Sequence, residues 1–287
     1  MRWLVLLAVA AFAGCAHVAP RDSQPRVEEV RVGDARFLVQ YWADDAASVR
    51  QVVAAVEHAA PRVARWGTLT SPVTFIINPS HEALESAVRR EGYSWLRAWA
   101  QFATINMQSP RTWSLFGGSQ RDVEELVTHE LTHCVMYQSA STEFNWPYKG
   151  IPLWFREGLA SVTADQGHRR GRVEDLWRYY EQSAPGSGDG VPGSRARVAF
   201  GAQGKEGDPI ADPEPMYQEQ SEIVYGAAHH AFQFLVDRYG EERVRGVLSS
   251  MAQGRTFSRA FEESIGISEP EFAADFRRYV VWQGWRR

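Results

Sequence analysis

The first part of the chain alternates apolar and polar residues in the way that is typical of half-buried β-strands. Two such stretches flank Gly33-Asp34, and this turn signal predicts a β-hairpin over residues 27–42. Within residues 46–66, Val49, Val52, Val53 and Val56 stand at helical spacing, which predicts an amphipathic helix. Residues 73–78 are mostly apolar and predict a buried strand.

Two cap signals mark further helices. Ser80 precedes a short helix that we predict over residues 81–90. Residues 119–122 (Ser-Gln-Arg-Asp) resemble a capping box, and the helix that follows carries an apolar stripe. The stripe consists of Val123, Leu126, Val127, Leu131 and Val135. It predicts a central, buried helix, and residues 98–107 predict one more strand before it.

Helical patterns dominate the second half of the chain. They predict helices over residues 172–182, 222–239, 241–251 and 270–285. Residues 184–215 hold seven glycines and five prolines, which predicts either a mobile surface insertion or a lid over a cleft. Strands in the first part and helices in the second predict an α+β fold, with a small N-terminal mixed β-sheet and a mainly helical C-terminal part.

The chain begins with a pattern that is typical of a signal peptide. Arg2 supplies a positive start and is followed by eleven consecutive apolar residues, Trp3 to Ala13. A helix needs about twenty apolar residues to span a membrane, so this run is too short for a transmembrane anchor. We therefore expect residues 1–14 to be a signal peptide and the protein to be exported.

Residues 13–15 (Ala-Gly-Cys) resemble a bacterial lipobox, although Phe12 stands where an aliphatic residue is usual. The motif implies a lipidated Cys15, a polar tether over residues 15–26 and a lipid-anchored protein of the cell envelope, at the outer membrane if the organism has one. Residues 11–13 (Ala-Phe-Ala) also fit an ordinary cleavage site, which leaves a soluble secreted form open.

Composition and charge narrow the class of protein. A chain of 287 residues with 44% hydrophobic and 23% charged residues is ordinary for a globular protein. The net charge of -4, with no cluster of arginine and lysine, gives no electrostatic reason to expect a nucleic-acid partner. Cys134 is the only cysteine besides Cys15, so we expect no intrachain disulfide. The oligomeric state stays open.

The segment His129-Glu130-Leu-Thr-His133 carries the most informative chemistry. Residues four apart lie on one face of a helix, so both imidazoles can reach one metal ion. Glu130 points slightly round the helix, where it can hold a water molecule and take its proton. This is the arrangement of zinc hydrolases, which use two histidines and one carboxylate base from a single helical turn.

A zinc site of this kind needs a third protein ligand. Glu157 lies 24 residues after His133, and Gly150 and Pro152 mark the start of a second helix with Glu157 in its early turns. Two helices joined by a loop can bring their faces together around one ion. Cys134 points about 100° away from His133 on the helix, so we expect it to pack in the core.

The two motifs together resemble those of the gluzincin peptidases, and most of all the bacterial peptidase-MA-like group. That group carries HExxH and then a proline, an aromatic residue and EGLA, as in residues 129–133 and 152–160 here. The resemblance covers about residues 35–285. It implies a zincin-like fold, one zinc ion held by His129, His133 and Glu157, and Glu130 as the general base. It also implies a peptide or protein substrate that pairs along the strand predicted over residues 98–107.

The other patterns of this kind of enzyme are missing. Metzincins continue as HExxHxxGxxH, and neither that glycine nor a third histidine follows His133. The GAMEN motif of related aminopeptidases is missing as well, which favours an endopeptidase.

Later residues supply candidates for supporting roles. Tyr225 begins a segment similar to the family's late helix, in which a tyrosine or histidine donates a hydrogen bond to the oxyanion. The alternative is a packing tyrosine, and His229 and His230 are more typical of core or surface residues. Ser161 stands where thermolysin-like enzymes carry an aspartate that orients a ligand histidine, and it could only do so without charge.

We therefore predict a zinc metallopeptidase of the bacterial envelope, with parts over residues 27–165 and 166–287. One alternative is a non-catalytic binding or scaffold protein on a zincin fold, but such a protein would be expected to lose the base or a ligand, and neither is lost. Another is a zinc amidase that acts on cell-wall peptides, which the zinc chemistry does not separate from proteolysis.

Overall fold

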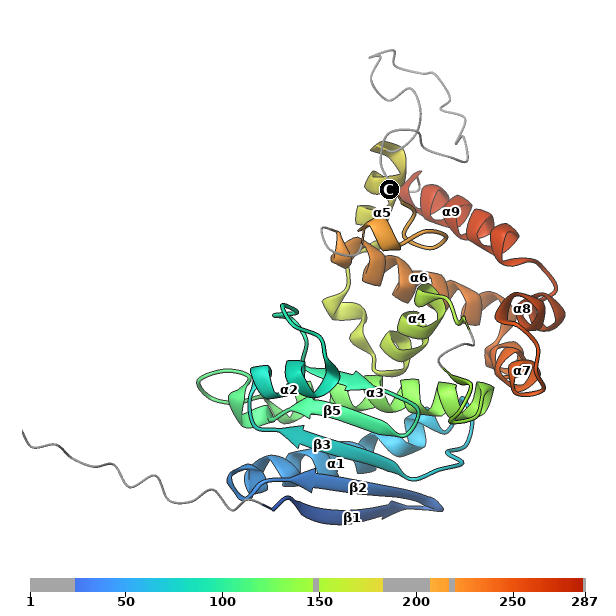
Figure 1. The fold of residues 1–287 in the computed structure, drawn as a ribbon. Coiled ribbons are helices and arrows are strands. Elements are labelled where there is room, and N and C mark those ends of the chain that lie inside the picture. The colour runs from blue at the N-terminus through green and yellow to red at the C-terminus, as the bar shows by residue number, and fades with distance from the viewer. Residues whose placement is uncertain (1–23, 147–149, 183–206, 217–219, 286–287) are drawn as a thin grey trace, which may run out of the picture.

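A five-stranded mixed sheet forms the N-terminal part of the computed structural model, which describes residues 24–146, 150–182, 207–216 and 220–285 (Figure 1). The strands are β1 (Arg26–Val32), β2 (Ala35–Tyr41), β3 (Val73–Asn78), β4 (Ala98–Ala100) and β5 (Thr104–Gln108). Their order is β1-β2-β3-β5-β4. β3 runs parallel to β2 and β5, whereas β1 and β4 are antiparallel to their neighbours. β4 therefore forms one edge of the sheet.

β1 and β2 are the hairpin that the sequence predicts. Gly33 has a φ of 57° in the turn between them, a left-handed conformation that glycine adopts without strain. Phe37 and Val39 in β2 are fully buried, whereas Leu38 between them is only partly buried. The alternation in the sequence is thus the pleat of a strand with one face in the core.

The single strand predicted over residues 98–107 is wrong. The chain reverses within this segment, where the N–H of Gln101 donates to the carbonyl oxygen of Thr104 over 2.8 Å, and β4 and β5 pair as antiparallel strands. The reversal passes through Gln101, Phe102 and Ala103, which include none of the residues that normally signal a turn. An apolar segment without a turn signal therefore predicts one continuous strand.

The helices of this part are α1 (Ala46–Val63), α2 (His81–Val88) and α3 (Gln120–Ala140). α1 and α3 pack against each other on one face of the sheet (Figure 1). Both predicted caps are confirmed, because the Ser80 side chain accepts from the N–H of Ala83 and the Ser119 side chain accepts from the N–H of Asp122. These caps fix where α2 and α3 begin.

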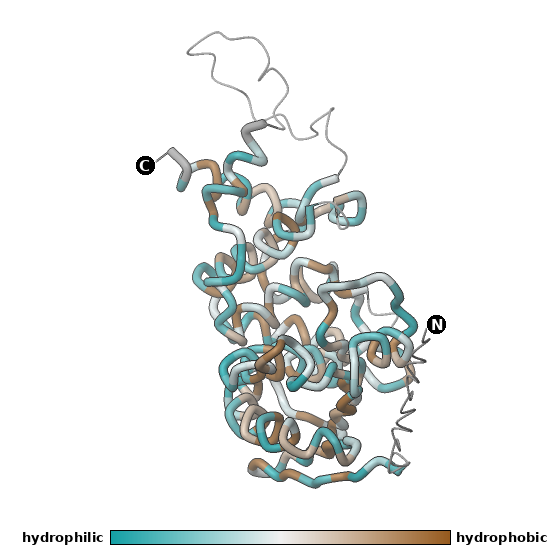
Figure 2. Tube along the Cα trace, turned by 90° about the vertical axis from the view of Figure 1, so that its left-hand side faces the viewer, coloured by the Kyte–Doolittle hydropathy of each residue, from teal (hydrophilic) through white to brown (hydrophobic). Residues whose placement is uncertain are grey.

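The described residues after α3 are mainly helical. Their helices are α4 (Leu153–Thr163), α5 (Val173–Gln182), α6 (Ser221–Tyr239), α7 (Glu241–Ala252), α8 (Phe257–Ile265) and α9 (Glu269–Trp285). The predicted helix that carries Glu157 is present as α4. The helices predicted over residues 172–182, 222–239, 241–251 and 270–285 are present as α5, α6, α7 and α9 with ends within one residue, whereas α8 is not among the predicted ones. Figure 2 shows apolar and polar stretches following each other along these helices, as expected for helices with one buried side. Among the described residues, no helix is both long and apolar enough for a membrane span.

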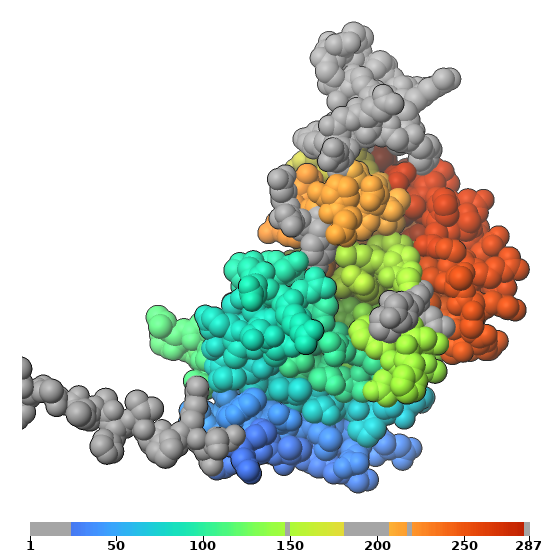
Figure 3. Space-filling view, viewed as in Figure 1, coloured from blue at the N-terminus to red at the C-terminus, as the bar shows by residue number. Residues whose placement is uncertain are grey.

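One hydrophobic cluster joins the sheet to the helices and includes Phe75, Leu131, Phe155 and Phe232. Trp66, which follows α1, packs its ring against Phe232 of α6 at a centroid distance of 5.6 Å. The space-filling view shows the segment that carries α4 (yellow-green) between the sheet part (blue to teal) and the C-terminal helices (orange to red) (Figure 3). α4 therefore lies where the two parts meet.

The described end of the glycine-rich segment is folded. The backbones of Asp208 and Asp212 exchange two hydrogen bonds of 2.8 and 2.9 Å, and Ile210 between them is buried. Residues 207–216 of the predicted surface insertion thus form a turn closed by these two hydrogen bonds, followed by a short 3-10 helix, η5 (Glu214–Met216). Residues 184–206 of that insertion lie outside the described residues, as do the predicted signal peptide and Cys15.

Gly158 allows α4 to cross α6 at close range, which makes its replacement a test of the packing. A Cβ at Gly158 would lie 2.3 Å from the carbonyl oxygen of Ala228 and 2.5 Å from the Cβ of Phe232. Overpacking of this kind costs about 1–3 kcal/mol. We expect Gly158→Ala to lower the free energy of unfolding by about that amount in urea denaturation.

Gly246→Ala in α7 is the matched control. A Cβ there would lie 3.2 Å from the Ser264 hydroxyl, which can rotate away, and alanine favours a helix by about 1 kcal/mol over glycine. Equal destabilisation by the two substitutions would contradict the packing argument.

Candidate metal centre

α3 holds both predicted histidine ligands near its middle. His129 and His133 are one helical turn apart, and both side chains are buried. Their Nε2 atoms lie 3.2 Å apart, and the two rings cross at 83°. The same nitrogen of each ring therefore faces a common point beside α3.

α4 brings Glu157 to that point from a later segment of the chain. Its Oε2 lies 3.4 Å from His129 Nε2 and 3.7 Å from His133 Nε2. Each of the three residues offers a ligand atom within 4.8 Å of the others, as a metal-holding group requires. The structure thus brings the three predicted ligands together.

The spacing of the three atoms fits a small tetrahedral ion. Zinc binds nitrogen and oxygen at about 2.0–2.1 Å, and a regular tetrahedron of that size has edges of about 3.3–3.4 Å. The observed separations of 3.2, 3.4 and 3.7 Å approximate one face of it. Two imidazoles also argue against Mg²⁺ and Ca²⁺, which prefer oxygen ligands. The donor set and its size therefore suit zinc.

The protonation states suit metal binding as well. Burial lowers the pKa of His133 to about 3, so its imidazole is neutral at neutral pH. Burial opposes the charge of Glu157, but the imidazoles of His133 and His129 and the Arg156 guanidinium outweigh it and lower the pKa of Glu157 to about 2. A neutral imidazole and an ionised carboxylate are the forms that bind a cation.

Glu130 lies beside the ligands and faces the edge of the sheet. Burial raises the pKa of Glu130 to about 7, although His129 and a hydrogen bond from the backbone of Ala100 in β4 oppose the shift. A carboxyl group of this kind can both take and return a proton near neutral pH. The predicted base thus stands between the metal group and strand β4.

The second nitrogen of His129 is bound by a residue that the sequence analysis missed. His129 Nδ1 lies 3.0 Å from Oε1 of Gln166, which belongs to a short 3-10 helix, η4 (Gln166–Arg169), directly after α4. Ser161, which the family resemblance suggested for such a role, hydrogen-bonds to His229 and Arg170 instead. No local motif marks Gln166, because its partner is 37 positions away.

His133 is supported by aromatic packing. Its ring stacks on Tyr137 at a centroid distance of 6.2 Å, and Tyr137 in turn packs on Trp146 at 4.8 Å. The Nδ1 of His133 is buried and has no hydrogen-bond partner among the described residues. Packing against flat aromatic rings thus fixes the orientation of this imidazole. Cys134, beside it, is fully buried, as predicted.

Tyr225 lies in α6, in the neighbourhood of the metal group. Its ring packs against Trp95 at a centroid distance of 6.3 Å and lies 5.3 Å from the Arg170 guanidinium. Arg170 interacts electrostatically with both Glu157 and Tyr225, so one guanidinium links the tyrosine to the ligand. Of the two nearby histidines, His229 is bound to a serine and His230 to a backbone carbonyl.

A comparison with protein-family models finds no match for this chain, and a comparison with curated proteins finds none either. The interpretation of the site therefore depends on the chemistry and the positions of its own residues, which are His129, Glu130, His133 and Glu157.

A divalent cation should stabilise the fold through this group. A ligand at 100 times its Kd stabilises the state that binds it by about 2.7 kcal/mol. We expect zinc to raise the melting temperature of the protein and to bind one ion per chain, and His133→Ala to lose both effects. His81→Ala, whose imidazole pairs with Glu85 on α2, should keep both. A zinc-induced shift of equal size in His133→Ala would exclude this group as the binding site.

Proposed function

We propose that this protein is a zinc-dependent peptidase of the gluzincin type on a zincin-like fold. The observation that supports it most is the convergence of His129, His133 and Glu157 on one point, with the carboxyl group of Glu130 beside it. Three ligands leave a fourth tetrahedral position free, which is the composition of a catalytic rather than a structural zinc site.

The residues of the site have distinct tasks in peptide hydrolysis. Zinc held there would polarise a peptide carbonyl and lower the pKa of a water molecule to about 7. Glu130 accepts the proton of the attacking water at its carboxylate and returns it to the leaving nitrogen. His129, His133 and Glu157 would hold the zinc ion that supplies the positive charge for this reaction.

The edge of the sheet offers a place for an extended substrate. The carbonyl oxygen of Arg97 accepts a hydrogen bond from Gln108 of β5, and the N–H of Gln101 donates to Thr104 of β5, each over 2.8 Å. Between these two positions, successive residues of β4 direct their backbone groups alternately toward β5 and away from it. Ala98 and Ala100 therefore direct their N–H and C=O groups away from β5, and the backbone of Ala100 hydrogen-bonds to Glu130. A peptide that adds to β4 as a further strand passes the base, which suits an endopeptidase.

We further propose that the protein acts in the bacterial envelope as a lipoprotein anchored through Cys15. This part of the proposal is supported by the sequence of residues 1–15, which resembles a signal peptide with a lipobox.

Replacing the base separates binding from catalysis. We expect Glu130→Gln to keep its zinc and to lose activity by about 10²–10⁴-fold, because the carboxamide cannot accept the proton. The measurement is digestion of a peptide library with and without a chelator, together with the zinc content. Glu124→Gln on the same helix should keep full activity, because Glu124 bonds to Gln120 outside the metal group. Full activity in Glu130→Gln would remove this mechanism.

Tyr225 is proposed as the donor to the oxyanion. Loss of such a donor costs about 10²–10³-fold in kcat, so Tyr225→Phe should lower kcat by that factor and leave KM nearly unchanged. Tyr239→Phe, at the other end of α6, is the control and should change neither constant. Unchanged kcat in Tyr225→Phe would show that this tyrosine only packs.

A further inference from the structure

The chain that leaves α4 folds back onto α3. Asp165 has a φ of 53°, an uncommon left-handed conformation for a residue other than glycine, and it turns the chain directly into η4. This turn brings Gln166 to His129 Nδ1, the ring nitrogen that does not face the metal group. One continuous segment therefore supplies the ligand Glu157 and a partner for the ligand His129.

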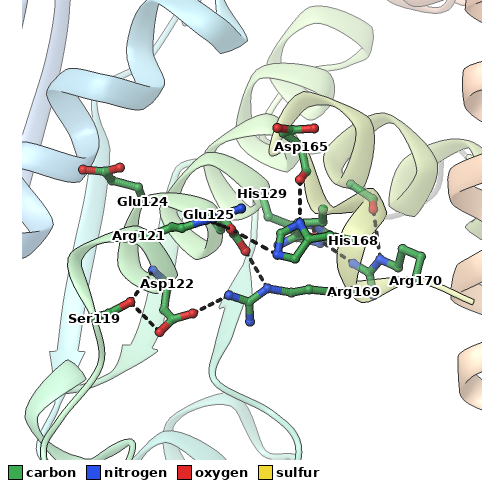
Figure 4. Close-up of polar contacts among 12 residues, drawn as sticks. Ser119, Arg121, Asp122, Glu124, Glu125, His129, Asp165, His168, Arg169 and Arg170 are labelled. Atoms are coloured by element: carbon green, nitrogen blue, oxygen red, sulfur yellow. Dashed lines mark hydrogen bonds and ion pairs between the residues drawn. The ribbon is translucent and has the colours of Figure 1, made fainter.

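Ion pairs fix η4 to the first turns of α3 (Figure 4). Arg169 pairs with Asp122 and, through its Nε, with Oε2 of Glu125 over 2.5 Å. His168 Nε2 lies 3.4 Å from the other oxygen of Glu125, whose side chain is buried. Glu125 is one helical turn before His129 on the same face of α3. The position of η4 is thus set relative to the helix that carries the histidine ligands.

Arg170 determines which atom of the Gln166 amide faces His129. Gln166 Oε1 lies 3.0 Å from His129 Nδ1 and accepts a hydrogen bond of 2.7 Å from Arg170 Nη2. An amide could present its NH₂ group after a rotation of 180°, but a guanidinium has only donors and accepts no hydrogen bond. The oxygen must therefore face Arg170 and His129 together.

This orientation fixes the tautomer of the imidazole. Because Oε1 of Gln166 carries no hydrogen, His129 must donate from Nδ1, and in the neutral form of the imidazole the lone pair is then on Nε2. His129 Nε2 is the atom that lies 3.4 Å from Glu157 and 3.2 Å from His133. The lone pair with which a neutral His129 binds a cation thus faces the metal group.

Arg170 is itself held from the far side. Its Nε donates to Ser161 Oγ over 3.0 Å, which leaves the hydroxyl hydrogen free to donate to His229 Nδ1, also at 3.0 Å. Burial lowers the pKa of His229 to about 4, so this imidazole is neutral and can accept. A Cβ on Gly167 would lie 3.0 Å from His229 Nε2, so glycine allows η4 to approach α6 this closely.

We propose that Gln166 is the positioning residue of the zinc ligand His129, and that Arg170 acts through Gln166 by fixing the rotation of its amide. The proposal rests on the metal centre proposed above. It assigns to a neutral amide and an arginine the task that a carboxylate performs in many zinc sites. An amide that is hydrogen-bonded to a guanidinium places less negative charge next to the imidazole than a carboxylate does. Gln166→Glu should therefore bind zinc at least as tightly as the natural chain.

The test is the affinity for zinc, measured by competition with a chromophoric chelator on the full chain. Gln166→Met keeps the length of the side chain without its hydrogen bonds, and it should weaken binding about 10–100-fold. Arg170→Met should weaken binding about tenfold. In the Q166E background the same Arg170→Met should cost less than about threefold, because a carboxylate presents an oxygen in either rotation.

Cobalt(II) provides a second readout, since its visible absorption bands report ligand geometry independently of hydrolysis. Gln166→Met and Arg170→Met should change these bands, and Q166E should restore them in the presence of Arg170→Met. Arg178→Met is the control, because Arg178 pairs with Asp175 on the surface of α5, and it should change neither the affinity nor the bands. If Gln166→Met fails to fold, Gln166→Asn, which withdraws the amide by one methylene, should give the same loss.

The outcomes distinguish this proposal from the proposed function. A natural chain that binds no zinc would overturn both. Zinc binding that is equally tight in the natural chain and in Gln166→Met would overturn the positioning role alone. An equal loss from Arg170→Met with Gln166 and with Q166E would show that Arg170 does not act through the amide.

Discussion

The meeting of the Glu157 carboxylate with the imidazoles of His129 and His133 is the interaction on which the rest of the site depends. A buried carboxylate is stable as an ion only when groups that favour its charge surround it. α4 carries Glu157 to α3, and it reaches this position because Gly158 lets it lie close to α6. The packing of helices from both parts of the chain therefore determines whether a metal group exists.

The hydrogen-bonded network beside His129 costs free energy because polar groups are removed from water, and it also fixes the orientation of the side chains in it. Removing charged and polar groups from water is unfavourable unless each finds a partner. Here hydrogen bonds join Gln166 to Arg170, Arg170 to Ser161, and Ser161 to His229. Such bonds are directional, so they fix the rotation of side chains that apolar contacts would leave free. His133, in contrast, is held by the flat faces of aromatic rings.

Much of the architecture was predictable, because the direction of the side chains repeats with a fixed period along a strand and along a helix. The hairpin at Gly33, the strand over residues 73–78 and the capped start of α3 at Ser119 each have a local signal, and each is present. The division of residues 98–107 into β4 and β5 was not predictable, because the chain turns there without glycine, proline, asparagine or aspartate.

The sequence by itself determined that His129 and His133 share one face of a helix, with Glu130 beside them, because that arrangement follows from the local geometry of an α-helix. Only the tertiary structure decided that Glu157 reaches them and that Gln166 orients His129. Those contacts form between segments that are distant in sequence, and they depend on how helices pack and on where the chain turns. No periodicity along the chain carries that information.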